Sequence, residues 1–253
     1  MAAYLITGAS RGLGLAMAAE LAASPESEVS VIFATSRQPN PPAVIDLVDK
    51  TSGKVVPVYL DPNDPQSLQS AVEQVERRLQ GRGLDGLVNN AGIMPMTAGM
   101  IENMENLTDV LHTNVTLSHL VTRAFMPLLR KGNGKTIVNI TSTLGSIGRA
   151  PTAIMHPAHA YKISKAAMNM MTVLYAHEYA EEGFSIFAVN PGWLRTDMGG
   201  ENADLPVETG AQEVVKYLKH DGQELNGRFL NIHIPGWENA PGHNQYDGKD
   251  PVW

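Results

Sequence analysis

Cysteine is absent from this 253-residue sequence. Disulfides, thiolate metal ligands and a cysteine nucleophile are therefore excluded, although the absence leaves the redox compartment undetermined. Long apolar runs are also missing, and no stretch reaches the roughly 18 apolar residues that suggest a membrane-spanning helix. No basic segment or cleavage site precedes the apolar run Tyr4-Leu5-Ile6, so we expect no secretory signal.

Basic clusters are missing as well. The chain has 19 Lys and Arg against 26 Asp and Glu, a net charge of -7. We therefore expect neither nucleic acid nor an anionic membrane as a partner. Because signal and membrane-spanning segments are also missing, we expect a cytoplasmic protein. With 43% hydrophobic and 18% charged residues, the chain suits one compact α/β domain with a sizeable core.

Short apolar runs alternate with helical patterns along the chain. This alternation is typical of parallel βαβ units, so we predict an α/β protein with a parallel sheet. The predicted strands are Ala3–Thr7, Val29–Ala34, Val55–Tyr59, Gly86–Asn89, Thr136–Ile140, Ser185–Val189 and Phe229–Ile232. The predicted helices with clear bounds are Leu13–Ala23, Gln66–Gln80, Leu107–Arg130 and Tyr161–Glu182, and Asp64 is the expected N-cap of the second.

A glycine-rich stretch, Thr7-Gly8-Ala9-Ser10-Arg11-Gly12-Leu13-Gly14, follows the first predicted strand and opens a helix. A diphosphate needs backbone amides that point at it and no Cβ in the way, so glycines recur at such turns. Because this loop lies at the first turn of an alternating pattern, we interpret it as a dinucleotide site rather than a chance match.

The end of the second predicted strand indicates which dinucleotide binds. NAD sites usually offer a carboxylate there, but no Asp or Glu occurs from Val29 to Ile45. Thr35-Ser36-Arg37 stands there instead, with Arg11 as a second cation. Arginine binds phosphate bidentately, which favours NADP(H). The alternative is that Arg37 is only a solvated surface residue.

Tyr161 and Lys165 are spaced i, i+4 and so share one helix face. A phenol with a pKa of about 10 is a poor acid–base catalyst, and a nearby ammonium favours its phenolate. Taken alone, a surface pair explains this spacing better. Two further polar residues favour a site: Ser142 follows the fifth predicted strand, and Asn114 lies inside an apolar helix, where a satisfied core amide is the alternative.

Together, these motifs resemble the short-chain dehydrogenase/reductase family over essentially the whole chain. The segment Pro191–Gly200 and the ending Tyr246-Asp247-Gly248 with Pro251-Val252-Trp253 resemble sniffer-like and C-factor-like carbonyl reductases. The resemblance implies a single-domain Rossmann fold, with a doubly wound seven-stranded parallel sheet and helices on both faces. The cofactor half would span about residues 1–105 and the catalytic and substrate half about residues 106–253. The matching residues are Thr7-Gly8-x-x-x-Gly12-x-Gly14, Asp61, Asn89-Asn90-Ala91-Gly92, Asn114, Ser142, Tyr161-x-x-x-Lys165, Pro191-Gly192 and Thr196.

The resemblance also implies roles in carbonyl reduction. Tyr161 would protonate the carbonyl oxygen, and Ser142 would hold that oxygen by a hydrogen bond. Lys165 would bind the nicotinamide ribose and lower the pKa of Tyr161. Asn114 would hold a water that links Lys165 to solvent.

Cofactor contacts are implied by the same resemblance. Asp61 would meet the adenine amino group, Asn90 to Gly92 the adenosine ribose, and Thr196 the nicotinamide carboxamide. The implied cofactor-binding residues are Gly8, Ser10, Arg11, Gly12, Leu13, Gly14, Ser36, Arg37, Asp61, Asn90, Ala91, Gly92, Asn114, Tyr161, Lys165, Pro191, Gly192 and Thr196.

Two segments depart from the family's pattern. The segment between Ser142 and Tyr161 is longer than usual and contains His156 and His159. Because no third metal ligand is evident, we interpret it as a polar loop near the substrate and expect no metal. In the second segment, Pro62 follows Asp61 and would fix the turn without blocking the adenine contact.

The expected substrate pocket is apolar and adaptable, which suits ketones, aldehydes or quinones better than phosphorylated sugars. Each methionine in it could equally belong to the core. Many family members pair through the two long helices, so we expect a homodimer or homotetramer, unless the long loop keeps a monomer. The candidate substrate residues are Met94, Met96, Met155, Trp193 and Met198.

Three functions stay open from the sequence. An NADPH-dependent carbonyl reductase is favoured over an NAD-dependent alcohol dehydrogenase that works oxidatively. The third is an NADP(H)-binding sensor without turnover, but such proteins usually lack the tyrosine, lysine or serine that this chain retains.

Overall fold

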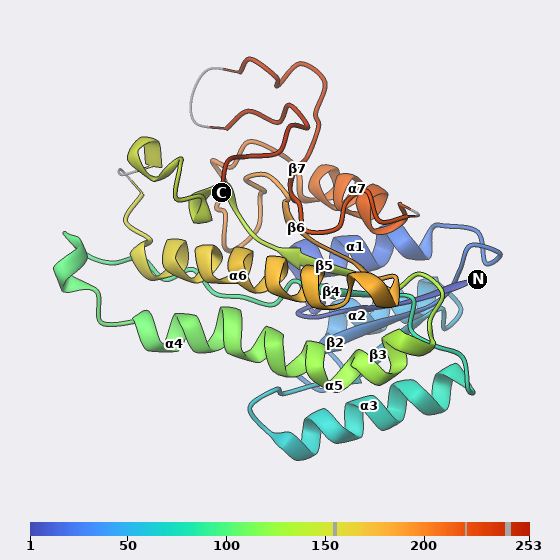
Figure 1. Ribbon diagram of the computed structural model, residues 1–253. Helices are drawn as coiled ribbons and strands as arrows, with labels where there is room; N and C mark the ends of the chain where they lie inside the picture. Colours follow the sequence, from blue (N-terminus) through green and yellow to red (C-terminus); the bar gives the residue numbers. More distant parts are fainter. Residues whose placement is uncertain (154–155, 221, 241–243) are drawn as a thin grey trace.

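Buried apolar runs assemble into one central sheet (Figure 1). The computed structural model describes residues 1–153, 156–220, 222–240 and 244–253. All seven strands pair in parallel, in the order β3-β2-β1-β4-β5-β6-β7, which confirms the predicted parallel sheet. The strands are β1 (Ala2–Ile6), β2 (Val29–Ser36), β3 (Val55–Tyr59), β4 (Gly86–Asn89), β5 (Thr136–Ile140), β6 (Ser185–Asn190) and β7 (Phe229–Asn231).

The strand order reverses between β1 and β4. The chain winds outward from β1 to β3 on one side and from β4 to β7 on the other. This is the doubly wound arrangement, in which ligands bind at the carboxyl ends of the strands beside the reversal. The glycine loop follows β1 and the Asn90–Gly92 segment follows β4, so the topology places both beside this point.

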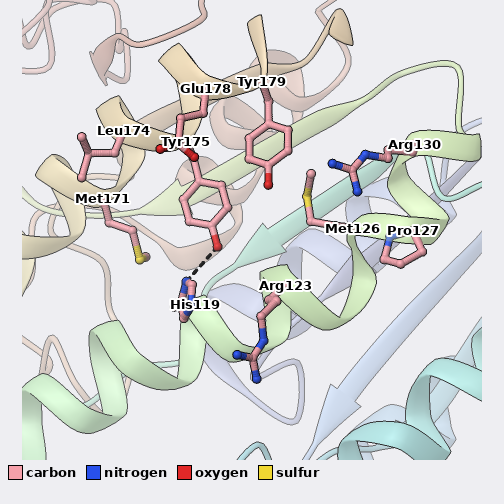
Figure 2. A pocket seen from close by; sticks show the side chains of 10 residues that line it. All are labelled: His119, Arg123, Met126, Pro127, Arg130, Met171, Leu174, Tyr175, Glu178 and Tyr179. Atoms are coloured by element: carbon pink, nitrogen blue, oxygen red, sulfur yellow. Dashed lines mark hydrogen bonds between the residues drawn. The ribbon is translucent and has the colours of Figure 1, made fainter.

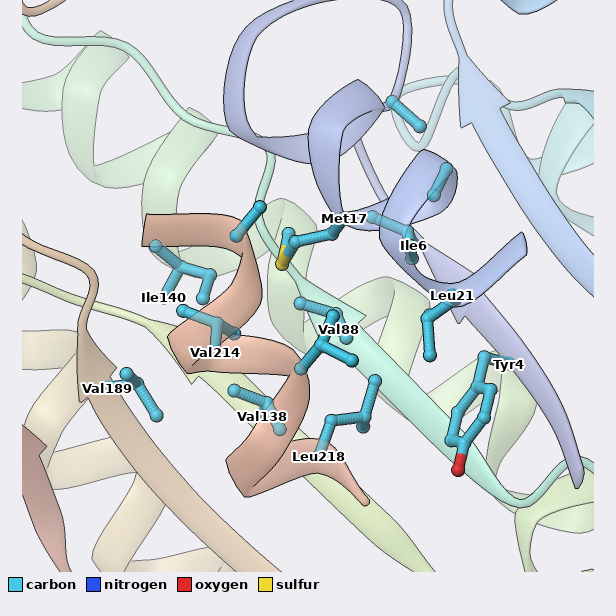
Figure 3. Close-up of a cluster of buried hydrophobic side chains, with 14 of the residues drawn as sticks. Tyr4, Ile6, Met17, Leu21, Val88, Val138, Ile140, Val189, Val214 and Leu218 are labelled. Carbon is cyan, nitrogen blue, oxygen red and sulfur yellow. The ribbon is translucent and has the colours of Figure 1, made fainter. Parts of the chain in front are cut away.

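Helices cover both faces of the sheet because alternate strand residues point to opposite sides. In β1, Tyr4 and Ile6 belong to one buried cluster with Leu21 and Leu218 (Figure 3), whereas Leu5 belongs to a second cluster on the other face. Helices α1 and α7 pack in the first cluster, and α3 and α5 in the second. The helices are α1 (Gly12–Ala22), α2 (Pro42–Lys50), α3 (Pro65–Leu79), α4 (Leu107–Leu111), α5 (Leu117–Lys131), α6 (His159–Glu178) and α7 (Val207–Leu218).

The end of α3 that faces the site is capped as the sequence predicts. The Asp64 carboxylate accepts a 2.9 Å hydrogen bond from the Gln66 backbone N–H, and Pro65 is the first helical residue. A proline is suited to this position because its missing N–H would have no helical partner. This confirms the expected N-cap, with the helix running one residue earlier than predicted at each end.

The predicted helix Leu107–Arg130 is not a regular α-helix. A π-helical turn, His112–Thr116, separates α4 from α5. Such a turn accommodates an extra residue in the helix, and it often marks a functional site. The predicted helix Tyr161–Glu182 also divides, because α6 ends at Glu178 and a 3₁₀ turn, Ala180–Glu182, follows before Gly183.

The C-terminal stretch from Pro235 contains no helix or strand within its described residues, as the sequence predicts. Short 3₁₀ turns form at Ile101–Asn103, Thr143–Gly145 and Ala150–Ala153. Among the described residues, no helix is both long and apolar enough to cross a membrane.

We predict that Leu21→Ala lowers the free energy of unfolding by about 3 kcal/mol, because it leaves a cavity between α1 and the sheet. Leu21 is fully buried, whereas Ile101 is 58% exposed. Ile101→Ala is therefore the control, with an expected loss of under about 0.5 kcal/mol. Urea unfolding measures both, and equal losses in the two variants would contradict this description of the core.

Candidate active site

The glycine loop is held against the end of β4. Gly8 and Gly12 have φ values of +65° and +54°, which favour glycine over residues with a side chain. A Cβ on Gly8 would lie 2.9 Å from the Ala91 Cα, and one on Gly14 would lie 2.5 Å from the Gly8 carbonyl oxygen. These three glycines thus let the loop pack closely against the segment after β4. They also leave its backbone amides uncovered by side chains, as a pyrophosphate site requires.

The Thr7 hydroxyl fixes the segment after β4 to this loop. It accepts hydrogen bonds from the backbone N–H groups of Asn90 (2.9 Å) and Ala91 (3.0 Å). The Asn90 side chain donates to the Thr7 carbonyl at 2.8 Å, so its amide braces the loop. The structure therefore brings together two motifs that are far apart in the sequence.

The two arginines expected near a 2′-phosphate differ in their surroundings. Arg11 forms a 2.5 Å ion pair with Asp197, and their side chains are 76% and 74% exposed. Arg37 is exposed directly after β2, and it forms no ion pair within the described parts of the chain. The Ser36 hydroxyl donates to the Gln38 carbonyl at 2.5 Å. Arg37 is thus the more available of the two cations.

Asp61 lies in a tight turn after β3. Its Oδ1 accepts hydrogen bonds from the Asn63 backbone N–H and side-chain amide, both at 3.0 Å. The Asp64 N–H donates to the Asp61 carbonyl, also at 3.0 Å, which closes the turn that Pro62 occupies. Both hydrogen bonds to the side chain use the same oxygen of the carboxylate.

Ser142, Tyr161 and Lys165 meet at the carboxyl edge of the sheet. Ser142 follows β5 and caps the next 3₁₀ turn by accepting from the Leu144 N–H at 3.1 Å. Its hydroxyl lies close enough to Tyr161 to favour the phenolate form of that side chain. The Lys165 Nζ lies 5.4 Å from the centre of the Tyr161 ring and donates to the Ile140 carbonyl at 2.7 Å.

Burial dominates the electrostatics of this group. It raises the pKa of Tyr161 to about 12, with a smaller opposing effect from the Ser142 hydrogen bond. It lowers the pKa of Lys165 to about 8. The net shift of the Tyr161 pKa is therefore upward, because loss of solvation of the phenolate outweighs the opposing effect of Ser142.

Asn114 lies on the π-helical turn and is fully buried. Its Oδ1 accepts from the Ile93 N–H at 2.8 Å, and its Nδ2 donates to the Ile93 carbonyl (3.0 Å) and the Ser164 hydroxyl (2.9 Å). A Cβ on Gly92 would lie 3.1 Å from this Oδ1 and 3.9 Å from the Lys165 Nζ. The π-helical turn thus places a satisfied amide beside the buried lysine.

The loop after β5 and the loop after β6 border the candidate catalytic group. Thr196 lies over the glycine loop, since a Cβ on Gly12 would be 3.5 Å from its methyl group. Gly192 has a φ of +88° directly after Pro191, where β6 has ended. The ring of His156, from the loop after β5, packs edge-on against Trp193 with centroids 6.4 Å apart.

The candidate substrate residues are partly open to solvent. Met96, Met198 and Trp193 are 54%, 45% and 36% exposed, and Met94 is half-buried. Met155 lies outside the described residues. No group of three or more His, Cys, Asp or Glu side chains that could hold a metal occurs in the described ranges.

A cavity of about 480 Å³ lies elsewhere, between α5 and α6 (Figure 2). The Tyr175 hydroxyl and the His119 ring are hydrogen-bonded there at 2.8 Å, and Tyr175 stacks on Tyr179. Its lining contains none of the catalytic side chains. No motif in the sequence predicts this cavity.

Two polar residues at the ends of β6 and β7 were not predicted as part of the site. Asn190 and Asn231 end β6 and β7, and the Asn190 Nδ2 donates to the Asn231 Oδ1 at 2.9 Å. The available signal was an asparagine at the carboxyl end of each strand, at the same edge as Ser142.

Comparisons with known proteins agree with this geometry. The model of the short chain dehydrogenase family matches residues 2–205. Short-chain dehydrogenase anuI from Penicillium roqueforti is 34% identical over 236 residues, covering 90% of this chain and 92% of its own. An NADPH-bound carbonyl reductase from chicken fatty liver superposes with a TM-score of 0.83 at 33% identity, covering 100% of this chain and 98% of the other. The carbonyl reductase Sniffer of D. melanogaster gives 0.85 at 30% identity, with 100% of both chains covered.

The burial of Lys165 predicts a pH-dependent stability. The pKa of this residue falls from 10.5 to about 8, so the folded state binds fewer protons than the unfolded state between these values. Stability must then rise with pH across that window. Between pH 7 and pH 10, the free energy of unfolding of the wild type, measured with urea, should rise by about 2 kcal/mol more than that of Lys165→Met. Parallel pH profiles for the two proteins would contradict the buried ammonium.

Proposed function

The chain belongs to the short-chain dehydrogenase family of oxidoreductases, and from this membership we propose that it reduces an apolar ketone, aldehyde or quinone with NADPH. The observation that carries the proposal is the cluster of Ser142, Tyr161 and Lys165, in which Ser142 lies near the phenol and the Lys165 ammonium lies over its ring. This arrangement presents two hydroxyls to one carbonyl oxygen at the edge of the sheet where ligands bind.

Tyr161 is the proposed proton donor. With a pKa raised to about 12, its phenol stays protonated at neutral pH and can donate to the oxygen of the carbonyl as negative charge develops there. Ser142 holds the same oxygen by a hydrogen bond and stabilises that charge. When bound, the nicotinamide supplies the hydride to the carbonyl carbon.

Lys165 acts on the phenolate that this proton transfer leaves. Its pKa of about 8 keeps most of the ammonium charged at neutral pH, and it lies 5.4 Å from the ring centre. A positive charge in a buried site favours the phenolate, so it lowers the cost of the transfer. Asn114 is the proposed support for a water through which solvent replaces the proton that Lys165 passes to the Tyr161 phenolate.

The proposed cofactor is NADP(H). The three loop glycines leave room for backbone amides to meet a pyrophosphate, and Arg37 offers a guanidinium where an NAD site would need a carboxylate. The chicken carbonyl reductase, which is 33% identical, holds NADPH. The remaining proposed contacts are Gly8, Ser10, Arg11, Gly12, Leu13, Gly14, Ser36, Asp61, Asn90, Ala91, Gly92, Pro191, Gly192 and Thr196.

The substrate class is proposed from the exposed apolar side chains around the site. Met96, Met198 and Trp193 offer polarisable, adaptable contacts that suit an apolar substrate. The two carbonyl reductases that superpose over the whole chain support this choice.

A homodimer or homotetramer is the proposed assembly. The exposed residues Met170 (61%) and Leu174 (55%) lie on α6, and Leu174 lines the cavity that α6 forms with α5. Such a surface is apolar enough to pack against a second copy of the chain.

Removal of the Tyr161 hydroxyl tests the mechanism. Tyr161→Phe should lower kcat at least about 100-fold, because the proton donor is lost, while the Kd for NADPH stays within about twofold. Tyr59→Phe, at a 46% exposed tyrosine on β3, is the matched control and should keep full activity. Full turnover by Tyr161→Phe would reject the proposed proton donor.

Reversal of the charge at Arg37 tests the cofactor. Arg37→Asp should shift the ratio of kcat/KM values from NADPH toward NADH by about 10- to 100-fold, the worth of a charge-assisted contact to the 2′-phosphate. Arg78→Asp, at an exposed arginine on α3, controls for the change in net charge. An unchanged preference in Arg37→Asp would contradict the NADP(H) assignment.

A further inference from the structure

The last described stretch of the chain, residues 244–253, is here called the C-terminal strap. It lies beyond the part that the family model matches, which ends at residue 205. Figure 1 shows the C-terminus beside the segment that follows β5. Its hydrogen bonds reach both loops that border the catalytic group, as the contacts of Tyr246, Val252 and Trp253 establish.

The first contact fixes the loop after β6. Tyr246 is almost fully buried, with 1% of its surface exposed. Its hydroxyl accepts from the Trp193 N–H at 3.1 Å and donates to an Asp204 carboxylate oxygen at 2.6 Å. A Cβ on Gly192 would lie 3.3 Å from the Tyr246 ring. One hydroxyl thus joins the beginning of this loop to its end.

The second contact fixes the loop after β5. Ser146 is buried, with 2% of its surface exposed, and its hydroxyl donates to the Val252 carbonyl at 2.6 Å. The Gly148 N–H donates to the Trp253 carbonyl at 2.8 Å. A Cβ on Gly148 would lie only 2.8 Å from the Val252 Cγ2, so the strap passes close against the loop.

A series of hydrogen bonds through buried side-chain amides also links the loop after β5, the ends of β6 and β7, and the strap. The Thr143 N–H donates to the Asn190 Oδ1 at 3.3 Å, next to Ser142. The Asn190 Nδ2 donates to the Asn231 Oδ1 at 2.9 Å, and the Asn231 Nδ2 donates to the Gln245 carbonyl at 2.7 Å. Since both asparagines are buried, each lost hydrogen bond would leave a polar group without solvent.

We propose that the C-terminal strap is a positioning element that sets the separation of the two loops and thereby the KM for the carbonyl substrate. The loops meet at the His156 and Trp193 rings, and each is held by a different part of the strap. The kinetic half of this inference rests on the proposed reductase function. The structural half does not, so the two can fail separately.

Single-atom variants test it. Tyr246→Phe removes the hydroxyl that Trp193 and Asp204 share. Ser146→Ala removes the donor to Val252 and also the acceptor of the Arg149 N–H, so the Gly148 amide, which donates to the strap at Trp253, is the one that reports on the strap in this variant. The matched control is Tyr175→Phe, which also deletes a hydrogen-bonded tyrosine hydroxyl but lies between α5 and α6. Amide hydrogen exchange over residues 143–149 and 192–199, and over β5 as an internal reference, measures the loops without any substrate.

In Tyr246→Phe, exchange over residues 192–199 should be about tenfold faster and over β5 unchanged. Ser146→Ala should do the same over residues 143–149. Each variant should raise the carbonyl KM about fivefold and leave the NADPH KM within about twofold, whereas Tyr175→Phe should change neither.

Unchanged exchange in both loops would overturn the proposal. Faster exchange with a carbonyl KM equal to that of the wild type would also overturn it, because the strap would then be only structural. If the wild type turns over no carbonyl, the proposed function fails. Hydrogen exchange in the two loops then tests whether the strap holds them. NADPH binding by the variants checks that they are folded.

Discussion

A charged lysine held out of water is the constraint on which the site depends. The Lys165 ammonium needs hydrogen-bond acceptors, and the Ile140 carbonyl at the end of β5 accepts from it at 2.7 Å. Gly145 must lack a side chain, because a Cβ there would lie 2.6 Å from the Lys165 Cβ. The strand end, the following turn and α6 are therefore fixed to one another. This rigidity keeps Ser142 near Tyr161 without a separate cost in ordering the two side chains.

The cofactor and catalytic parts of the site differ in how far their contacts reach along the chain. The glycine loop is a local motif at one strand end, and the sheet topology alone brings it to the Asn90–Gly92 segment. The proposed substrate side is built from two loops and the C-terminal strap, which meet through tertiary contacts. Such a division allows the substrate side to vary while the cofactor side keeps its geometry.

The sheet was largely predictable, because each strand is a short apolar run between turn signals and the alternation with helices dictates a parallel order. The π-helical turn at Asn114 was not, since one extra residue barely alters a helical periodicity read over a long window. The ion pair between Arg11 and Asp197 was equally hidden, because it joins residues 186 positions apart. The sign of the Tyr161 pKa shift depends on burial, which the Tyr-x-x-x-Lys spacing does not reveal.

The central claim is that this site transfers a hydride from NADPH to an apolar carbonyl. Its most direct test is NADPH oxidation, followed by absorbance with NADH alongside, against a panel of aldehydes, ketones and quinones. The structure predicts turnover of at least one apolar carbonyl with NADPH and slower turnover with NADH. NADPH binding without turnover of any member of the panel would contradict that claim and favour a protein that senses the cofactor.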